Sequence, residues 1–237
     1  YWWSARNTCI ELLGEKFDAT SLPKAVPESF HQLRPWIHKG WEMVLLAAEL
    51  LRSNSPLIIK GAKAFAANYP QRCQEALEFW GWQADQLQEA LDKIRRRALD
   101  ADRASWLALH RPFPGVVERL NCLKAEGVEL VVLTTKGAEF TAELLTSLHL
   151  KPNLLYGHES GSKPSVLLRL AAERSIQGFV EDRRATLEKV IKTPGLTSLP
   201  CYLASWGYLK PKDTQELPQG IHLLSPETLA TPLASWP

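Results

Sequence analysis

Hydrophobic residues in the first part of the chain recur at three- and four-residue steps, the spacing of one face of an α-helix. Residues 36–51 and 84–99 carry this pattern most clearly. Pro56 and Pro70 fit the junctions between helices, where a missing N–H is tolerated. No stretch here alternates with a period of two for long enough to indicate a strand. Residues 1–108 are therefore predicted to form an all-helical domain.

The pattern changes after about residue 108. The β-branched run at 128–134 has the length of a strand, and such near-continuous apolar runs are typical of parallel strands buried on both faces. Helical patterns then alternate with shorter apolar runs, and this alternation predicts right-handed crossovers and a parallel sheet. The further strands are predicted near 154–156, 176–180, 201–204 and 221–224. We predict an α/β fold, with a parallel Rossmann-like core in residues 109–237.

Composition and charge narrow the class of protein. The 237 residues are 45% hydrophobic and 23% charged, as in an ordinary globular protein, and the net charge of +2 gives no reason to expect a nucleic acid or an anionic membrane as partner. The cluster Arg95–Arg97 ends a helical pattern, where it would compensate the helix dipole. No apolar run is long enough to span a bilayer. Four scattered cysteines without metal spacing indicate free thiols, which favours a cytoplasmic location.

Polar side chains follow three of the predicted elements at the edge where ligands bind in parallel sheets. Thr134, with Thr135 and Lys136 after it, ends the first strand, and Lys163 precedes Pro164 at a helix start. Glu181 and Asp182 end the third strand. Two adjacent carboxylates repel each other unless a cation or proton is shared. Mg²⁺ is the usual ion where phosphate is also bound. The alternative is that the two acids cap the following helix.

Together these groups suit a phosphate and its metal. The Thr134 hydroxyl would donate to a phosphoryl oxygen, Lys163 would neutralise the charge of the phosphoryl group and its nucleophile, and the ion would do so from the other side. Each residue also has a simpler interpretation, as a strand-end cap or a solvated side chain. Thr135 and Lys136 are further candidates for substrate binding. Arg34 of the helical region is a weaker one, since a solvated helix face explains it.

The order of these motifs resembles the haloacid dehalogenase superfamily, and in particular its Mg²⁺-dependent phosphatases and phosphomutases with a helical cap domain. The resemblance covers nearly the whole chain. Residues 132–136 are similar to the second motif, with Thr134 as the phosphate-binding hydroxyl. Lys163 matches the lysine of the third motif. Glu181 and Asp182 match the fourth motif in its Glu-Asp form, which implies that both help to hold Mg²⁺. Residues 1–108 would then be the cap domain that selects the substrate.

The chain departs from the family pattern at the first motif. A strand ending in Asp-x-Asp should precede the cap domain and supply the nucleophile and the general acid/base. Asp100-Ala101-Asp102 has the right letters but follows no apolar strand, so it is interpreted as a solvated helix terminus. We expect roughly ten to twenty further residues before Tyr1. They would form a strand between those ending at Thr134 and Val180, and this strand would carry the nucleophilic aspartate.

The resemblance thus implies a Mg²⁺-dependent phosphatase that acts on a small phosphorylated metabolite through an aspartyl-phosphate intermediate. A phosphomutase is a variant of the same chemistry. A dehalogenase is disfavoured, because that branch does not need a metal-holding carboxylate pair. The competing class is a catalytically silent binding module that has kept the fold and lost the first motif.

Overall fold

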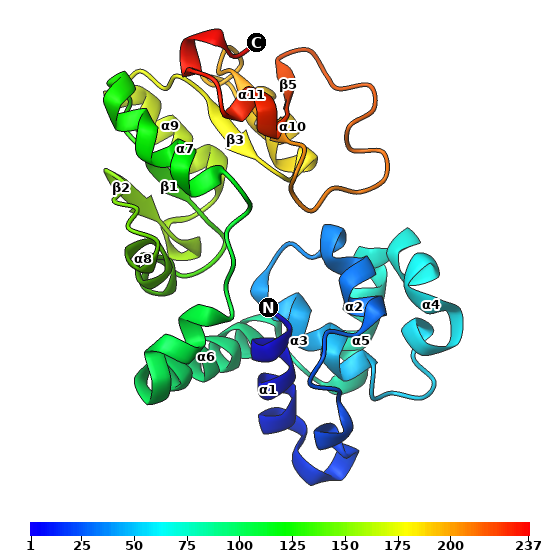
Figure 1. Ribbon diagram of the computed structural model, residues 1–237. Helices are drawn as coiled ribbons and strands as arrows, with labels where there is room; N and C mark the ends of the chain where they lie inside the picture. The colour runs from blue at the N-terminus through cyan, green and yellow to red at the C-terminus, as the bar shows by residue number, and fades with distance from the viewer. The chain divides into compact units, whose positions relative to one another are not determined.

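The computed structural model describes residues 1–14 and 17–237 with their side chains. The chain divides into two compact units, Tyr1–Trp106 and Leu107–Pro237, called the helical unit and the α/β unit below (Figure 1). The division falls beside the boundary predicted near residue 108. The fold is mixed α/β with short parallel sheets, as predicted. Among the described residues, no helix combines the length and apolar character needed to cross a membrane.

The helical unit is built around one buried helix, α3. Residues 43–48 of this helix are at most 3% exposed. Its neighbours α1 and α5 pack directly against it, and α2 packs on α4. The helices of the unit are α1 (Trp2–Leu13), α2 (Glu28–Leu33), α3 (Gly40–Glu49), α4 (Pro56–Ala67), α5 (Tyr69–Trp80) and α6 (Ala84–Ala108).

The pattern at 36–51, predicted as one helix, forms two elements instead. A 3-10 turn at Arg34–Trp36 ends before α3 begins at Gly40. The Glu42 carboxylate accepts the backbone N–H of His38 at 2.6 Å and fixes the turn between them. The helix does not run through continuously because Ile37 and Lys39 have extended backbone, with ψ of 123° and 156°.

The helix predicted at 84–99 is longer than its pattern. It continues to Ala108 through a kink at Asp102, where φ is −156° and ψ is 87°. The Asp102 carboxylate accepts the N–H of Ser105 at 3.0 Å, so it starts a new helical turn. Asp100-Ala101-Asp102 therefore lies exposed at the point where one helical stretch ends and the next begins, which agrees with the interpretation as a solvated helix terminus.

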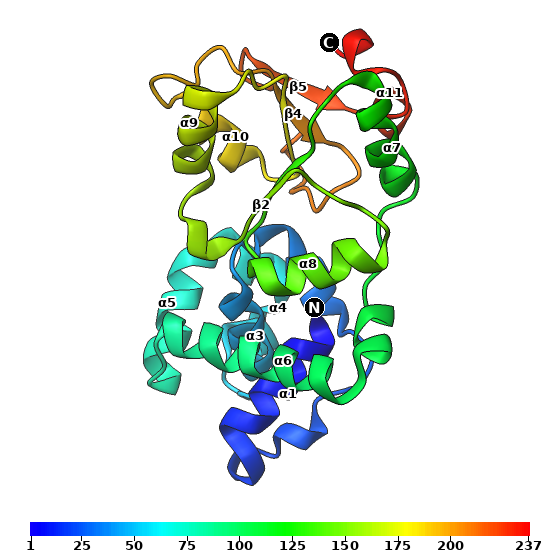
Figure 2. The same ribbon diagram turned by 90° about the vertical axis from the view of Figure 1, so that its left-hand side faces the viewer.

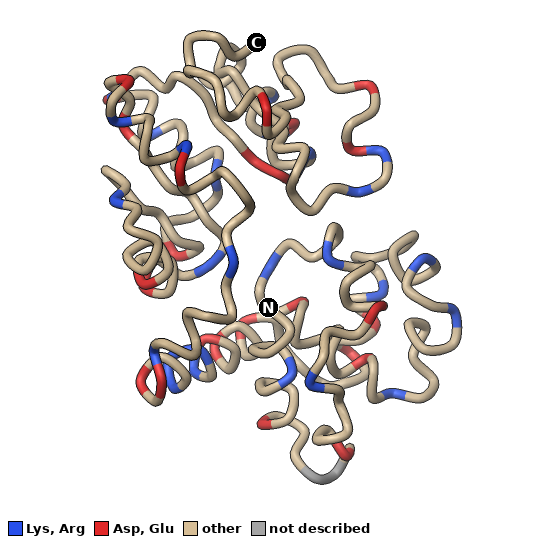
Figure 3. Tube along the Cα trace, viewed as in Figure 1, with Lys and Arg blue, Asp and Glu red and all other residues tan. Residues whose placement is uncertain are grey.

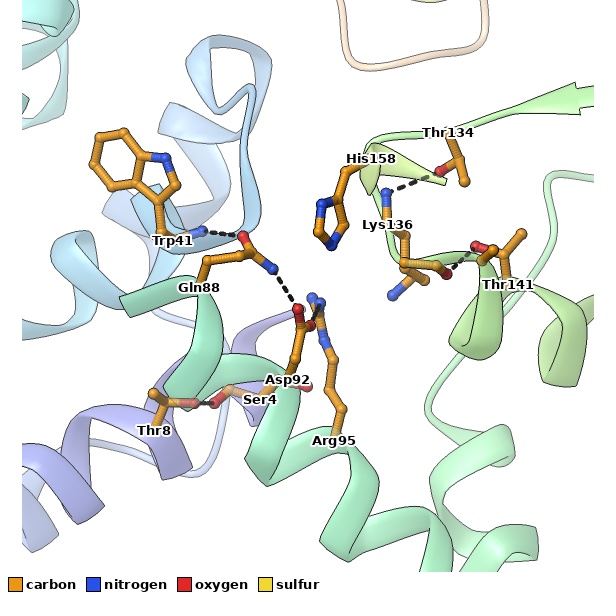
Figure 4. Close-up of polar contacts among 12 residues, drawn as sticks. Ser4, Thr8, Trp41, Gln88, Asp92, Arg95, Thr134, Lys136, Thr141 and His158 are labelled. Carbon is orange, nitrogen blue, oxygen red and sulfur yellow. Dashed lines mark hydrogen bonds and ion pairs between the residues drawn. The ribbon is translucent and has the colours of Figure 1, made fainter. Parts of the chain in front are cut away.

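The arginine cluster 95–97 lies in the part of α6 that ends at the kink at Asp102, and two of its members pair with acidic side chains. Arg95 is 3% exposed and donates to Asp92 at 3.0 Å. Gln88 donates to the same carboxylate at 2.9 Å and accepts the backbone N–H of Trp41 at 3.2 Å (Figure 4). Arg97 forms an ion pair with Glu11 of α1. Arg97 thus joins α6 to α1, whereas Arg95 pairs with an acidic residue of its own helix.

The α/β unit contains five parallel strands close to the predicted positions. They are β1 (Val131–Leu133), β2 (Leu154–Tyr156), β3 (Phe179–Glu181), β4 (Cys201–Ala204) and β5 (Ile221–Leu224). In register, Val131 pairs with Leu154, Glu181 with Leu203, and Leu203 with Leu223. The helices are α7 (Val116–Leu123), α8 (Ala138–Ser147), α9 (Lys163–Glu173), α10 (Arg184–Ile191) and α11 (Pro226–Leu229).

The sheet of β3, β4 and β5 lies between two helical layers. Figure 2 shows α9 and α10 on one face and α7 and α11 on the other. Leu187 and Val190 of α10 pack with Phe179 and Cys201 on the first face. On the second face, side chains from α7, α11 and the chain end gather around Tyr202 of β4. The side chains thus alternate along the strands as a two-sided core requires.

The predicted single sheet is present as two separate pieces. β1 pairs with β2, β3 pairs with β4, and β4 pairs with β5, but β1 and β3 do not pair with each other. Val131, Val132 and Leu133 are all half-buried, so the prediction of a strand buried on both faces was wrong. The physical reason is that β1 has a neighbouring strand on one side only. Leu133 still packs against the core of the larger sheet.

Charges and thiols are distributed without a special arrangement. Basic and acidic residues are interspersed along both units (Figure 3). Cys9, Cys73 and Cys201 are buried free thiols, and Cys122 is an exposed one, as predicted. Burial raises the pKa of the Cys9 thiol to about 12, which keeps it protonated and unreactive.

Candidate functional site

The candidate site lies in the α/β unit, where α9 begins and β3 ends. Ser162 is the N-cap of α9, and its hydroxyl oxygen accepts the N–H of Ser165 at 3.3 Å. Pro164 occupies the first turn, where its missing N–H would be unpaired anyway. The serine and the proline fix the start of the helix at Lys163. This residue thereby stands on a rigid element, as predicted from Ser162-Lys163-Pro164.

Lys163, at the start of α9, and Glu181, at the end of β3, form an ion pair. The Lys163 ammonium donates to Oε2 of Glu181, and their side chains are 18% and 9% exposed. The ammonium also lies 6.0 Å from the ring centre of Phe179. A lysine held this way is a fixed charge at the carboxyl end of a strand, and the interpretation as a solvated surface lysine is wrong.

Burial dominates the electrostatics of Glu181. Loss of water raises its pKa above the ordinary value of 4.5, the ion pair with Lys163 lowers it, and the neighbouring Asp182 raises it again. Its second oxygen accepts the backbone N–H of Arg183 at 3.2 Å. Each of its oxygens thus accepts one hydrogen bond, and these contacts do not fully offset the cost of burying the charged form.

Asp182 is held by the loop that follows β4. Its Oδ2 accepts the backbone N–H of Tyr208 at 3.1 Å. A methyl group on Gly207 would lie 2.1 Å from the Cβ of Asp182, so only glycine fits there. Sequence reasoning noted this Trp-Gly-Tyr stretch but missed its contact with Asp182. A glycine just after a buried strand was the available signal.

The alternative interpretation, in which Glu181 and Asp182 cap the next helix, is not what the contacts show. The N-cap of α10 is Arg183, and this position has no side-chain capping bond. The two carboxylates instead accept hydrogen bonds from Lys163, Arg183 and Tyr208. They belong to the strand end and its neighbouring loop rather than to the helix.

Thr134 is positioned by the turn after β1. Its backbone N–H donates to Tyr156 at 2.9 Å, and its hydroxyl oxygen accepts the N–H of Lys136 at 3.1 Å (Figure 4). The Lys136 carbonyl accepts the N–H of His158 at 3.2 Å, and Thr135 is exposed. Because the oxygen of Thr134 accepts within the turn, its proton can still be donated outward.

The predicted site residues fall into three groups. Lys163, Glu181 and Asp182 form one cluster. In the part of the chain that the structure describes, no hydrogen bond or ion pair joins Thr134 to that cluster, although the adjacent Leu133 packs with Phe179. Arg34 belongs to the helical unit, where its guanidinium lies 4.3 Å from the ring centre of Tyr1.

Two carboxylates are the whole acidic donor set of this cluster. The described residues contain no group of three or more His, Cys, Asp or Glu side chains able to hold a metal ion. Zinc sites need three or four such ligands. Mg²⁺ binds proteins through one or two carboxylates and takes its remaining ligands from water and phosphate. Glu181 and Asp182 meet this requirement in number, and Oε2 of Glu181 is paired with the Lys163 ammonium in this structure.

No family model, curated protein or solved structure matches the chain. The chemistry of the site itself is therefore the basis on which a function can be assigned.

Proposed function

We propose that the protein is a Mg²⁺-dependent phosphatase of the haloacid dehalogenase type, acting on a small phosphorylated metabolite. The observation that carries this proposal is the pairing of Lys163 with Glu181, directly beside Asp182, at the carboxyl end of a parallel strand. Ligands bind at this edge in α/β proteins. A half-buried lysine and two adjacent carboxylates there suit phosphate chemistry better than a structural role.

Each group has a task in this proposal. The hydroxyl of Thr134 donates to a phosphoryl oxygen, and Lys163 offers a compact positive charge to the phosphoryl group and its nucleophile. Glu181 and Asp182 would hold Mg²⁺, which when bound supplies charge neutralisation to the phosphate oxygens. Tyr208 keeps the Asp182 carboxylate oriented through its backbone N–H. Thr135 and Lys136 lie on the turn after β1 and can contact the rest of the substrate.

The proposal includes a strand between β1 and β3. Both are parallel strands paired on one side only, and both bear residues of the site at or beyond their carboxyl ends. A parallel strand with an Asp-x-Asp end would satisfy both open edges and bring the nucleophile between Thr134 and Lys163. The helical unit would then act as the cap domain of the enzyme.

A catalytically silent binding module is the second candidate. The observation in its favour is that the Asp-x-Asp of this chain, at 100–102, lies at an exposed kink of α6. The carboxylates at the site are Glu181 and Asp182, which are already assigned to the metal. A protein with this site and no nucleophile would bind a phosphate ester without hydrolysing it.

The test is phosphate release by the native full-length protein from a panel of small phosphate monoesters, with Mg²⁺ and with EDTA. Hydrolysis that requires Mg²⁺ and is lost in Lys163→Ala would support the enzyme. Binding of a phosphate ester without turnover, measured by calorimetry, would favour the silent module. Neither binding nor turnover across the panel would overturn both candidates.

A further inference from the structure

Two anchors hold the loop between β4 and β5, which covers residues 205–220. The first is the hydrogen bond from Tyr208 to Asp182. Gly207 makes it possible, because its Cα approaches Asp182 too closely for any side chain. This anchor fixes only the beginning of the loop.

The second anchor is the guanidinium group of Arg184, the first residue of α10. Its Nη1 donates to the carbonyl of Gln215 at 2.5 Å and to that of Lys212 at 3.3 Å, and its Nη2 donates to that of Glu216 at 3.0 Å. Its Nε donates to Glu188 at 2.7 Å. The Arg184 side chain thus donates to several carbonyls in the far part of the loop. Within that part, Glu216 has a positive φ of 46°.

The geometry points to Arg184 as a positioning residue for Asp182, which it does not itself touch. We propose that Arg184 holds the loop 205–220 in the conformation in which Tyr208 donates to Asp182, and so sets the carboxylate for its cation. The inference rests on the proposed function. Asp182 and Arg184, the residues that bind the loop, are only two positions apart in sequence after the end of β3. They therefore hold the beginning and the far part of the sixteen-residue loop from one place in the fold. Only the planar fork of arginine reaches several carbonyls at once.

The experiment uses the native full-length protein and the variants Arg184→Ala and Arg184→Lys. Calorimetry measures the Mg²⁺ dissociation constant, and mass spectrometry follows tryptic cleavage after Lys212, inside the loop. We expect cleavage to become at least about tenfold faster, and the Mg²⁺ dissociation constant to rise about 10- to 100-fold, as for other residues that orient metal ligands. Arg184→Lys keeps the charge, so it should fold even where Arg184→Ala does not, and it should show the same changes.

A matched control and a double variant separate positioning from general destabilisation. Glu188→Gln removes the carboxylate partner of Arg184 and leaves the loop carbonyls bound, so neither readout should change. In an Asp182→Asn background, Arg184→Ala should not weaken Mg²⁺ binding further, whereas a merely destabilising change would add its effect.

The outcomes are distinct. Wild-type protein that binds Mg²⁺, together with Arg184 variants that bind it equally or are cleaved no faster, would overturn the positioning role and leave the proposed function intact. Wild-type protein that neither binds Mg²⁺ nor requires it for activity would overturn the proposed function and this inference with it.

Discussion

The two units each bury a glutamate against a basic side chain, but the two carboxylates differ in how completely they are satisfied. Glu49 of the helical unit has a fully buried side chain and accepts hydrogen bonds from Arg52, Ser55 and Trp80. Glu181 of the α/β unit accepts one bond from Lys163 and one from a backbone N–H, and it has a second carboxylate beside it. A saturated buried charge stabilises a structure, whereas an unsaturated pair at a strand end is suited to bind something.

The largest expected effect is on stability, at Glu49. Glu49→Ala leaves Arg52, Ser55 and Trp80 without their acceptor, and breaking such a buried pair costs about 3–5 kcal/mol. Denaturant unfolding of the variant measures this loss. Glu78→Ala, at an exposed position of α5, should cost less than about 1 kcal/mol. Equal losses in the two variants would contradict the structural role of Glu49.

The next effect is on turnover, at Lys163. Lys163→Ala removes the positive charge that we propose for neutralising the phosphoryl group, so we expect kcat of the native full-length protein to fall at least about a hundredfold. Arginine should not restore it, because a planar fork does not replace a compact ammonium. Lys189→Ala, on the exposed side of α10, is the control. Near-normal turnover in Lys163→Ala would show that Lys163 serves only as the ion-pair partner of Glu181.

A smaller effect concerns the metal. Asp182→Asn keeps an oxygen for the N–H of Tyr208 but removes the negative charge, so Mg²⁺ affinity should fall at least about tenfold, and activity with it. Titration calorimetry measures the affinity. Asp213→Asn, a loop aspartate that accepts the N–H of Lys210, should bind Mg²⁺ as the wild type does. An unchanged Mg²⁺ requirement in Asp182→Asn would remove Asp182 from the metal site.

The smallest effect is the pH dependence of stability. The pKa of Glu181 is raised on folding, chiefly by burial, so the folded state holds its proton more tightly than the unfolded state. The stabilisation is fully present below pH 4.5, the ordinary value, and is lost as the pH rises through the higher folded pKa. Glu181→Gln should therefore flatten the fall in unfolding free energy above pH 4.5.

Glu126 provides the opposite case in the same unit. Hydrogen bonding from Arg119 lowers the pKa of this exposed carboxylate, so its contribution to stability is lost as the pH falls below 4.5 through the lower folded pKa. Glu126→Gln should reduce the fall in unfolding free energy below pH 4.5 and leave the pH dependence above that value unchanged. If the unfolding free energies of Glu181→Gln and Glu126→Gln vary with pH in the same way, neither carboxylate determines the pH dependence of stability.

The strands and most helices could be predicted because their signals are local. The β-branched run before Thr134 and the serine and proline around Lys163 specify their own backbone. The pairing of Lys163 with Glu181 was not predicted as a contact. Their placement at one sheet edge followed from strand-helix alternation alone.

The features that could not be predicted depend on backbone atoms far away in sequence. No role was predicted for Arg184, because the carbonyls that it binds leave no pattern in the residue types of 212–216. The helical turns after Asp102 were missed for a local reason, because the hydrophobic pattern stops near residue 99 and the new turn is started by the hydrogen bonds of Ser105 to the Asp102 carboxylate. The assignment of the site to phosphate chemistry stays a prediction.

The one-sided pairing of β1 and β3 also has a consequence for how the molecule behaves in concentrated solution. Each strand offers a row of N–H and C=O groups to any extended segment of suitable length, including the same strand of a second molecule. The half-buried Val131, Val132 and Leu133 add apolar surface to that edge. We therefore expect the chain of 237 residues to self-associate as its concentration rises, which light scattering would detect. A peptide that supplies one apolar strand should suppress this association by occupying the edge first.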